Sequence, residues 1–148
     1  MVKIEFDLED FKAKLIDALE DTGVATVEKL KLDAPVAGGH LQRNIGYNVE
    51  ERGDQIILNF NFPEYAKYVE YGSGPRGDGT FTGTPALTES FIAEIEEWCR
   101  QKGIPLEMAG AIAKIISVEG TYMHPFIRPV MDTKFNDILL KNLKKSFK

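Results

Sequence analysis

The chain has 148 residues, a length that suits one compact domain. Hydrophobic residues make up 43% of it, which is enough to build a core, and its net charge of −5 disfavours broad binding to nucleic-acid phosphates. Cys99 is the only cysteine, so an internal disulfide and a zinc site built on several thiolates are excluded. We expect no signal peptide, because acidic residues appear from Glu5 onward, and no membrane helix, because no apolar run approaches the about 18 residues that one needs.

The N-terminal segment is predicted to form a long helix. Asp7 can cap a helix that starts at Leu8, and apolar residues then recur at three- and four-residue spacing. Gly23 interrupts this stripe and is a candidate for a bend or a break. The helix should end just before Pro35, because proline disfavours helical geometry in the residue that precedes it.

A β-hairpin follows in the predicted order. Apolar and polar residues alternate over 45–49 and again over 55–62, with a turn at 51–54 between them. One face of this hairpin should therefore be buried. The face that carries Asn59 and Asn61 should meet solvent or a neighbouring subunit.

A short helix and a glycine-rich loop come next. Pro63 permits a helix through Tyr65 and Tyr68 that stops at Gly72. Residues 72–84 contain five glycines and Phe81 as their one large apolar residue, so we interpret this segment as a mobile loop.

The C-terminal half is predicted to be helical. Pro85 should open a helix that ends at Gly103, and a second helix should end at Gly120, so that 85–119 forms a two-helix insertion. Residues 124–129 should be extended or briefly helical, because they include two prolines. A last helix should follow, with an apolar stripe from Met131 to Phe147 and these lysines exposed: Lys134, Lys141, Lys144, Lys145 and Lys148.

The fold class that follows is α+β, with a small antiparallel sheet flanked by a long N-terminal helix and a C-terminal helix. A glycine-rich loop and a two-helix segment are inserted between the sheet and the last helix. We expect one domain over residues 1–148.

Three local patterns occur in a set order along the chain. The first is Ala34-Pro35 followed by Gly39, Leu41 and Asn44; the second is Tyr65-Ala66-Lys67-Tyr68-Val69-Glu70-Tyr71-Gly72; the third is His124-Pro125-Phe126-Ile127-Arg128-Pro129-Val130-Met131. Together they resemble the tail-completion, or head–tail joining, family of long-tailed bacteriophages, over about residues 7–147. The chain departs from the family pattern at Ser73, where many members have threonine, and in the segment 72–119.

The resemblance implies a late structural component of the virion without catalysis, cofactor or metal. Such a protein would form a ring with itself, hexameric to match a sixfold tail tube. It would lie in the neck, between the head connector or stopper protein and the tail tube or tail terminator protein. It would be made in the cytoplasm of the bacterial host, with no specific nucleic acid and no membrane as partner.

Within these motifs, Glu70 and Arg128 are the candidate ion pair. A carboxylate near the C-terminal end of a helix opposes the helix dipole and should have a compensating partner. We hypothesise that Glu70 pairs with Arg128, within one subunit or across a ring interface; the alternative is a solvated carboxylate.

The other motif residues have structural interpretations. Tyr65 and Tyr68 should pack the short helix on the sheet, with direct partner contact as the alternative. Gly72 should end that helix with a positive φ. Pro125 and Pro129 should stiffen the chain before the last helix, and these two prolines would bracket Phe126, which should fill the core.

Two surfaces are candidates for partner contact. The loop residues Gly74, Pro75, Arg76 and Phe81 could order when a partner docks, although a plain flexible connection is equally compatible. The helix over 86–98 is acidic and the last helix is basic, so copies could meet head-to-tail in a ring; two ordinary solvated faces are the alternative.

Other functions remain as alternatives. The chain could be another minor tail or capsid component. A small hydrolase or nuclease would need His40 or His124 to work with Glu70, and a nucleic-acid-binding module would use the C-terminal lysines. The two histidines form no metal-binding motif, and the spacing around Ser73 is not that of a nucleophile elbow.

Overall fold

The structure of the chain is a computed structural model that describes residues 5–34, 40–63 and 66–148. Its elements, in chain order, are α1 (Leu8–Asp33), α2 (His40–Arg43), β1 (Gly46–Arg52), β2 (Gln55–Asn61), α3 (Ala66–Tyr71), the 3-10 turn η1 (Gly74–Arg76), α4 (Glu89–Lys102), the 3-10 turn η2 (Leu106–Met108), α5 (Ala109–Glu119), α6 (Ile127–Thr133) and α7 (Phe135–Ser146). The predicted α+β class, with its two-stranded antiparallel sheet between terminal helices, is confirmed. Pro35, Gly39 and Tyr65 lie outside the described residues.

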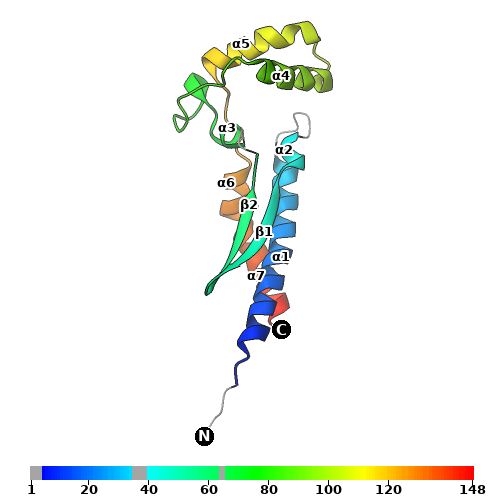
Figure 1. Ribbon diagram of the computed structural model, residues 1–148, viewed down its shortest axis with the longest axis vertical. Coiled ribbons are helices and arrows are strands. Elements are labelled where there is room, and N and C mark those ends of the chain that lie inside the picture. Colours follow the sequence, from blue (N-terminus) through cyan, green and yellow to red (C-terminus); the bar gives the residue numbers. More distant parts are fainter. Residues whose placement is uncertain (1–4, 35–39, 64–65) are drawn as a thin grey trace.

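The molecule is elongated and has two parts (Figure 1). The helices α1, α6 and α7 and the hairpin run side by side and form what we call the body. The helices α4 and α5 lie at one end of the body, and we call residues 89–119 the arm. The arm helices pack on each other and on the two 3-10 turns, so most of their surface is not covered by the body.

The long helix α1 begins and ends where the sequence predicts. The Asp7 side chain accepts a hydrogen bond from the main-chain N–H of Asp10 (3.1 Å), which satisfies one of the free donors of the first turn. The suggested break at Gly23 does not occur, because α1 continues through this residue. Gly23 is buried, and its missing side chain makes room for the Tyr47 ring of β1.

The hairpin has the predicted alternation. Tyr47 pairs with Phe60 and Val49 pairs with Leu58, so these apolar residues share one face of the sheet. That face lies on α1 and reaches the last helix, where the Phe60 and Phe135 rings meet edge-on at 6.0 Å between centroids. The opposite face carries Asn48, Asn59 and Asn61. Gly53 lies in the turn between the strands and has φ +62°.

The main core lies between the C-terminal half of α1, the hairpin and α6. Its buried members come from segments that are distant in sequence: Val27, Leu30, Ala34, Leu41, Ile45, Ala66, Phe126 and Val130. Phe126 is fully buried and meets Phe62 edge-on, at 6.2 Å between ring centroids, so its predicted role in filling the core is confirmed.

Two helix starts differ from the sequence prediction. The helix expected to open at Pro85 begins at Glu89, because the Thr88 hydroxyl accepts a hydrogen bond from the N–H of Phe91 (3.1 Å) and so caps it. Pro129 lies in the first turn of α6 and not before it, since that turn has no helical hydrogen bond for proline to remove.

The last helix is divided. Val130 accepts the N–H of Lys134, and Lys134 then accepts the N–H of Ile138, so α6 passes into α7 with a short interruption at Lys134. All five predicted lysines are exposed. In the arm, α4 and α5 end at Gly103 and Gly120 as predicted, and Cys99 is fully buried.

Candidate functional site

The second and third sequence motifs meet at the side chain of Glu70. This carboxylate is 1% exposed and accepts three main-chain hydrogen bonds, from the N–H groups of Phe126 (2.7 Å), Ile127 (2.8 Å) and Arg128 (2.9 Å). These groups lie at the start of α6, where a helix has donors without partners of its own. The next residue, Pro129, has no N–H. The carboxylate of α3 therefore caps α6 from 56 residues away.

The predicted ion pair is present within a single chain. The Arg128 Nε donates to Glu70 Oε1 at 2.9 Å, and its Nη2 donates to the Glu70 main-chain oxygen at 3.2 Å. The guanidinium carbon lies 4.4 Å from the centroid of the Tyr71 ring, which adds a cation–π contact. The solvated alternative for Glu70 is thus wrong, whereas the place of this pair at a subunit interface stays a prediction.

The hydrogen bonds decide the charge state of Glu70. Burial raises the pKa of the Glu70 carboxyl, but the three main-chain donors and Arg128 together outweigh burial and leave the pKa below its ordinary value. The Glu70 hydrogen bond in turn raises the pKa of Arg128. Because Glu70 is ionised and fully engaged, it is poorly placed to exchange a proton with His124 as the hydrolase alternative requires.

Sequence reasoning found the ion pair but missed the helix cap. The signal was available, because α6 starts without Ser, Thr, Asp or Asn at its N-cap, which is Phe126. A helix start of this kind needs an acceptor from elsewhere in the chain. The acidic residue of the second motif is the one that supplies it.

The chain crosses itself where the arm joins the body. Ser73 and Thr121 form an antiparallel bridge in which each main-chain N–H donates to the other residue's main-chain oxygen, with N to O distances of 2.9 and 3.1 Å. Their hydroxyl oxygens lie 3.0 Å apart. Gly72 has φ +72°, which confirms the positive φ predicted for it, and Gly120 has φ +80°. A Cβ atom on Gly120 would lie 1.8 Å from the main-chain oxygen of Ser73, so this crossing requires glycine at position 120.

The loop over 72–84 is fastened to its own chain at several points. Phe81 packs on Tyr68 and Tyr71, with 5.3 and 5.8 Å between ring centroids, and its oxygen accepts the N–H of Gly74 (3.0 Å). Arg76 forms an ion pair with Glu119. The mobility of the loop and its contact with a partner stay predictions.

Two neighbouring residues of α3, Tyr68 and Val69, pack against different parts of the molecule. Tyr68 was expected to pack on the sheet, but it packs on Phe81 because α3 presents this side of the helix to the loop. Val69, the next residue, packs against the main core. Pro75 and Pro125 are exposed.

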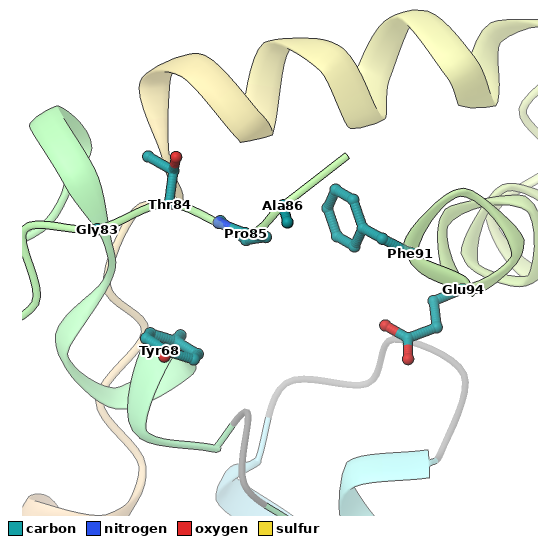
Figure 2. Close-up of a pocket in the computed structure, with 7 residues that line it drawn as sticks. All are labelled: Tyr68, Gly83, Thr84, Pro85, Ala86, Phe91 and Glu94. Atoms are coloured by element: carbon teal, nitrogen blue, oxygen red, sulfur yellow. The ribbon is translucent and has the colours of Figure 1, made fainter. Parts of the chain in front are cut away.

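A cleft lies where α3 and the loop face the arm (Figure 2). Its volume is ≈ 340 Å³, and we call it the arm cleft. The residues that line it are Tyr68, Gly83, Thr84, Pro85, Ala86, Phe91 and Glu94. Figure 2 shows the Phe91 ring and the Glu94 carboxylate, both from α4, directed towards the open space above Tyr68. Among the described residues of the lining, Glu94 is the only charged one, so this part of the cleft combines an apolar surface with one negative charge.

The arm and the segment after it also expose apolar side chains. Their exposed fractions run from 45% to 66%, in Leu106, Met108, Ile115, Val118, Tyr122 and Met123. Exposed apolar surface that gathers on one part of a molecule is typical of protein–protein contact. These side chains give the arm apolar surface that its own chain leaves exposed.

Two other kinds of site are absent from the part of the chain that the structure describes. Among the described residues, no three His, Cys, Asp or Glu side chains gather closely enough to hold a metal ion. No helix of the described part of the chain has the length and apolar character needed to cross a membrane.

The comparison with known proteins agrees with the motifs. Residues 4–72 match the family model HK97-gp10_like, whose description is "Bacteriophage HK97-gp10, putative tail-component". The match covers α1, the hairpin and α3 and ends at the glycine that closes the second motif. No curated protein and no solved structure matches the chain. The chain is thus similar, over residues 4–72, to a family of bacteriophage tail components, which confirms the resemblance drawn from its motifs.

Proposed function

We propose that the chain is a non-enzymatic structural protein of the virion neck that joins the phage tail to the head connector. The observation that carries this proposal is the match of residues 4–72 to phage tail components. The third motif, residues 124–131, extends the same resemblance to α6, beyond the matched residues.

The shape of the molecule supports an assembly role. A long body presents one set of surfaces, and the arm at its end exposes apolar side chains that its own body does not cover (Figure 1). A subunit of this form suits a closed ring of copies, in which the arm of each copy reaches a neighbour. We propose a hexamer, with the head connector or stopper protein on one side and the tail tube or tail terminator protein on the other.

The experiment is deletion of the gene from the phage or prophage that carries it, followed by electron microscopy of the lysate. We expect filled heads beside separate or malformed tails, and rescue by the intact gene supplied in trans. Normal tailed virions from the deletion would contradict the proposal. Tails that are absent altogether would favour another minor tail role over joining.

The same complementation assay tests the loop. We propose that residues 74–83, which include Arg76 and Phe81, contact the connector, the tail tube or the ring lumen. A gene that lacks these residues should then fail to restore joining, although the protein is made. Normal virions from that gene would mean that the loop is a plain connection.

A further inference from the structure

The arm cleft is an apolar hollow with a negatively charged edge. Tyr68 and Phe91 supply its aromatic surface, and Glu94 is exposed to solvent at its margin (Figure 2). Glu94 forms no ion pair with any described residue, whereas Glu96 and Glu97 on the same helix pair with Arg100. The group that fits this cleft is an apolar side chain with a positive charge beside it.

The outer face of α7 presents such a group. Leu140 is 53% exposed, although it is a large apolar residue in a helix. Lys141 follows it directly and Lys144 lies one turn further on the same side, and both are exposed. Neither of these lysines forms an ion pair within the described part of the chain, whereas Lys145 pairs with Asp21 of α1 at 3.7 Å.

The two surfaces cannot meet within one molecule. Figure 1 shows the arm at one end of the long axis, whereas α7 runs along the body towards the opposite end. Each surface therefore faces solvent in a single chain. Two different surfaces that are complementary on copies of the same chain make a heterologous contact, which can be repeated from copy to copy until a ring closes.

We propose that the arm cleft of one copy binds the Leu140 face of α7 in a second copy. The Leu140 side chain enters the cleft beside Tyr68 and Phe91, and Lys141 and Lys144 lie against Glu94. A cleft of ≈ 340 Å³ has room for a leucine side chain and the aliphatic stem of a neighbouring lysine. This contact names the partner surface for the arm and rests on the ring of the proposed function.

A second copy is favoured as the occupant because both halves of the match are on this chain. The cleft carries the Glu94 carboxylate and the α7 face carries two lysines, and none of these three side chains forms an ion pair within the described part of the chain. Charge complementarity of this kind selects the partner and fixes the register of docking.

The test is charge reversal in the full-length chain, followed by sedimentation velocity over a series of protein concentrations at low and high ionic strength. One variant is Glu94→Lys, a second combines Lys141→Glu with Lys144→Glu, and a third carries all three changes. The matched controls are Glu107→Lys in the arm and Lys29→Glu on α1, which change exposed charges that neither line the cleft nor belong to α7. All these positions are exposed, so the variants should fold, and circular dichroism checks this.

We expect the wild-type chain to self-associate at low ionic strength and to dissociate as salt is added. The first two variants should each weaken association about tenfold or more, because like charges then face each other, and the third should recover it. The controls should associate like the wild type. Leu140→Ser should weaken association at both ionic strengths.

Three results would overturn the inference: a wild-type chain that stays monomeric at every concentration, association that neither reversal weakens, or failure of the combined variant to recover it. These readouts need no virion. A monomeric wild type would overturn the docking contact and leave the gene deletion to decide the joining role. Normal virions from the deletion would overturn that role without changing the sedimentation result.

Discussion

The Tyr47 ring of β1 lies directly on Gly23 of α1. A Cβ atom on Gly23 would be 2.3 Å from Cδ2 of that ring, far inside contact distance. The Tyr47 hydroxyl donates a hydrogen bond to Glu20 Oε2 at 2.8 Å, and this bond raises the pKa of Tyr47. The hairpin is thus fixed on α1 at a helical position that has no side chain.

Gly23→Ala should therefore destabilise the fold. In a helix with open space, alanine is more favourable than glycine by up to about 1 kcal/mol. Here the added methyl group would displace the Tyr47 ring, whose hydroxyl is fixed by its hydrogen bond to Glu20. Overpacking of this kind costs about 1 to 3 kcal/mol. The measurement is the free energy of unfolding in urea, and an unchanged or higher value would contradict the contact.

Gly110→Ala is the matched control. Gly110 is also in a helix, but a Cβ atom there would meet no atom within 4 Å. The same substitution should leave stability unchanged or raise it by a few tenths of a kcal/mol up to about 1 kcal/mol. Opposite signs for the two variants would separate the effect of the Tyr47 ring from helix propensity.

Local patterns in the sequence predicted the elements whose causes are local. The start of α1 follows from Asp7, the hairpin from its alternation, and the end of α4 from Gly103. The roles of Gly23 and Glu70 were incomplete or wrong for a common physical reason. The partner of each comes from a distant segment, Tyr47 for the glycine and the start of α6 for the carboxylate, and no local periodicity reports such a contact.

The candidate site divides in the same way. The position of Glu70 near the end of a helix indicated that it needs a positively charged partner, and the hypothesised partner Arg128 is the one that the structure shows. The arm cleft was not predicted, because it forms only where α3, the loop and α4 converge. The Thr88 cap that sets the start of α4 is a local signal, because threonine is a favoured N-cap residue directly before a helix.

Glu70→Gln should lower stability by about 2 to 3 kcal/mol. An amide has one acceptor oxygen in place of two, so its NH₂ group would face main-chain donors of α6 or the Arg128 guanidinium. The buried donors left without an acceptor and the lost charge account for the expected loss. Urea unfolding followed by circular dichroism measures it.

Glu119→Gln provides the comparison for that variant. Glu119 also pairs with an arginine, Arg76, but its side chain is 52% exposed. An exposed pair of this kind contributes less than about 1 kcal/mol, so the second variant should be nearly as stable as the wild type. Equal losses at the two positions would contradict a capping role for Glu70.

The Glu70 contribution should depend on pH. Its carboxyl has a lower pKa in the folded chain than the ordinary value of 4.5. A carboxyl of this kind stabilises the fold fully above the unfolded pKa, and the contribution is lost as the pH falls through the folded pKa. The difference in unfolding free energy between wild type and Glu70→Gln should thus be largest at neutral pH and shrink below pH 4.5. A difference that stays constant down to about pH 3 would count against the ionised cap.

Gly120→Ala should disrupt the crossing between arm and body. The new Cβ atom would overlap the Ser73 oxygen, and Gly120 also has a positive φ that alanine disfavours. Gly103→Ala is the control, because Gly103 has φ +71° but open space around it, so it should cost only about 1 to 2 kcal/mol. Limited proteolysis should cut the first variant near residues 72–84 and 120–126 much faster than the second.

Phe81→Ala should loosen the loop without unfolding the body. The Phe81 ring holds the loop on α3 through Tyr68 and Tyr71, and aromatic pairs of this kind contribute about 0.5 to 1.5 kcal/mol each. None of these rings belongs to the main core, so the melting temperature of the body should change little.

Amide hydrogen exchange reads this change directly. The Gly74 N–H, which donates to the Phe81 oxygen, should exchange faster in Phe81→Ala, whereas amides of α1 should keep their protection. Thr82→Ala, at an exposed neighbouring position, should leave both unchanged. Ser73, next to Gly74, exchanges two main-chain hydrogen bonds with Thr121. If the Gly74 amide keeps its protection in Phe81→Ala, this bridge holds the loop and the aromatic contacts do not.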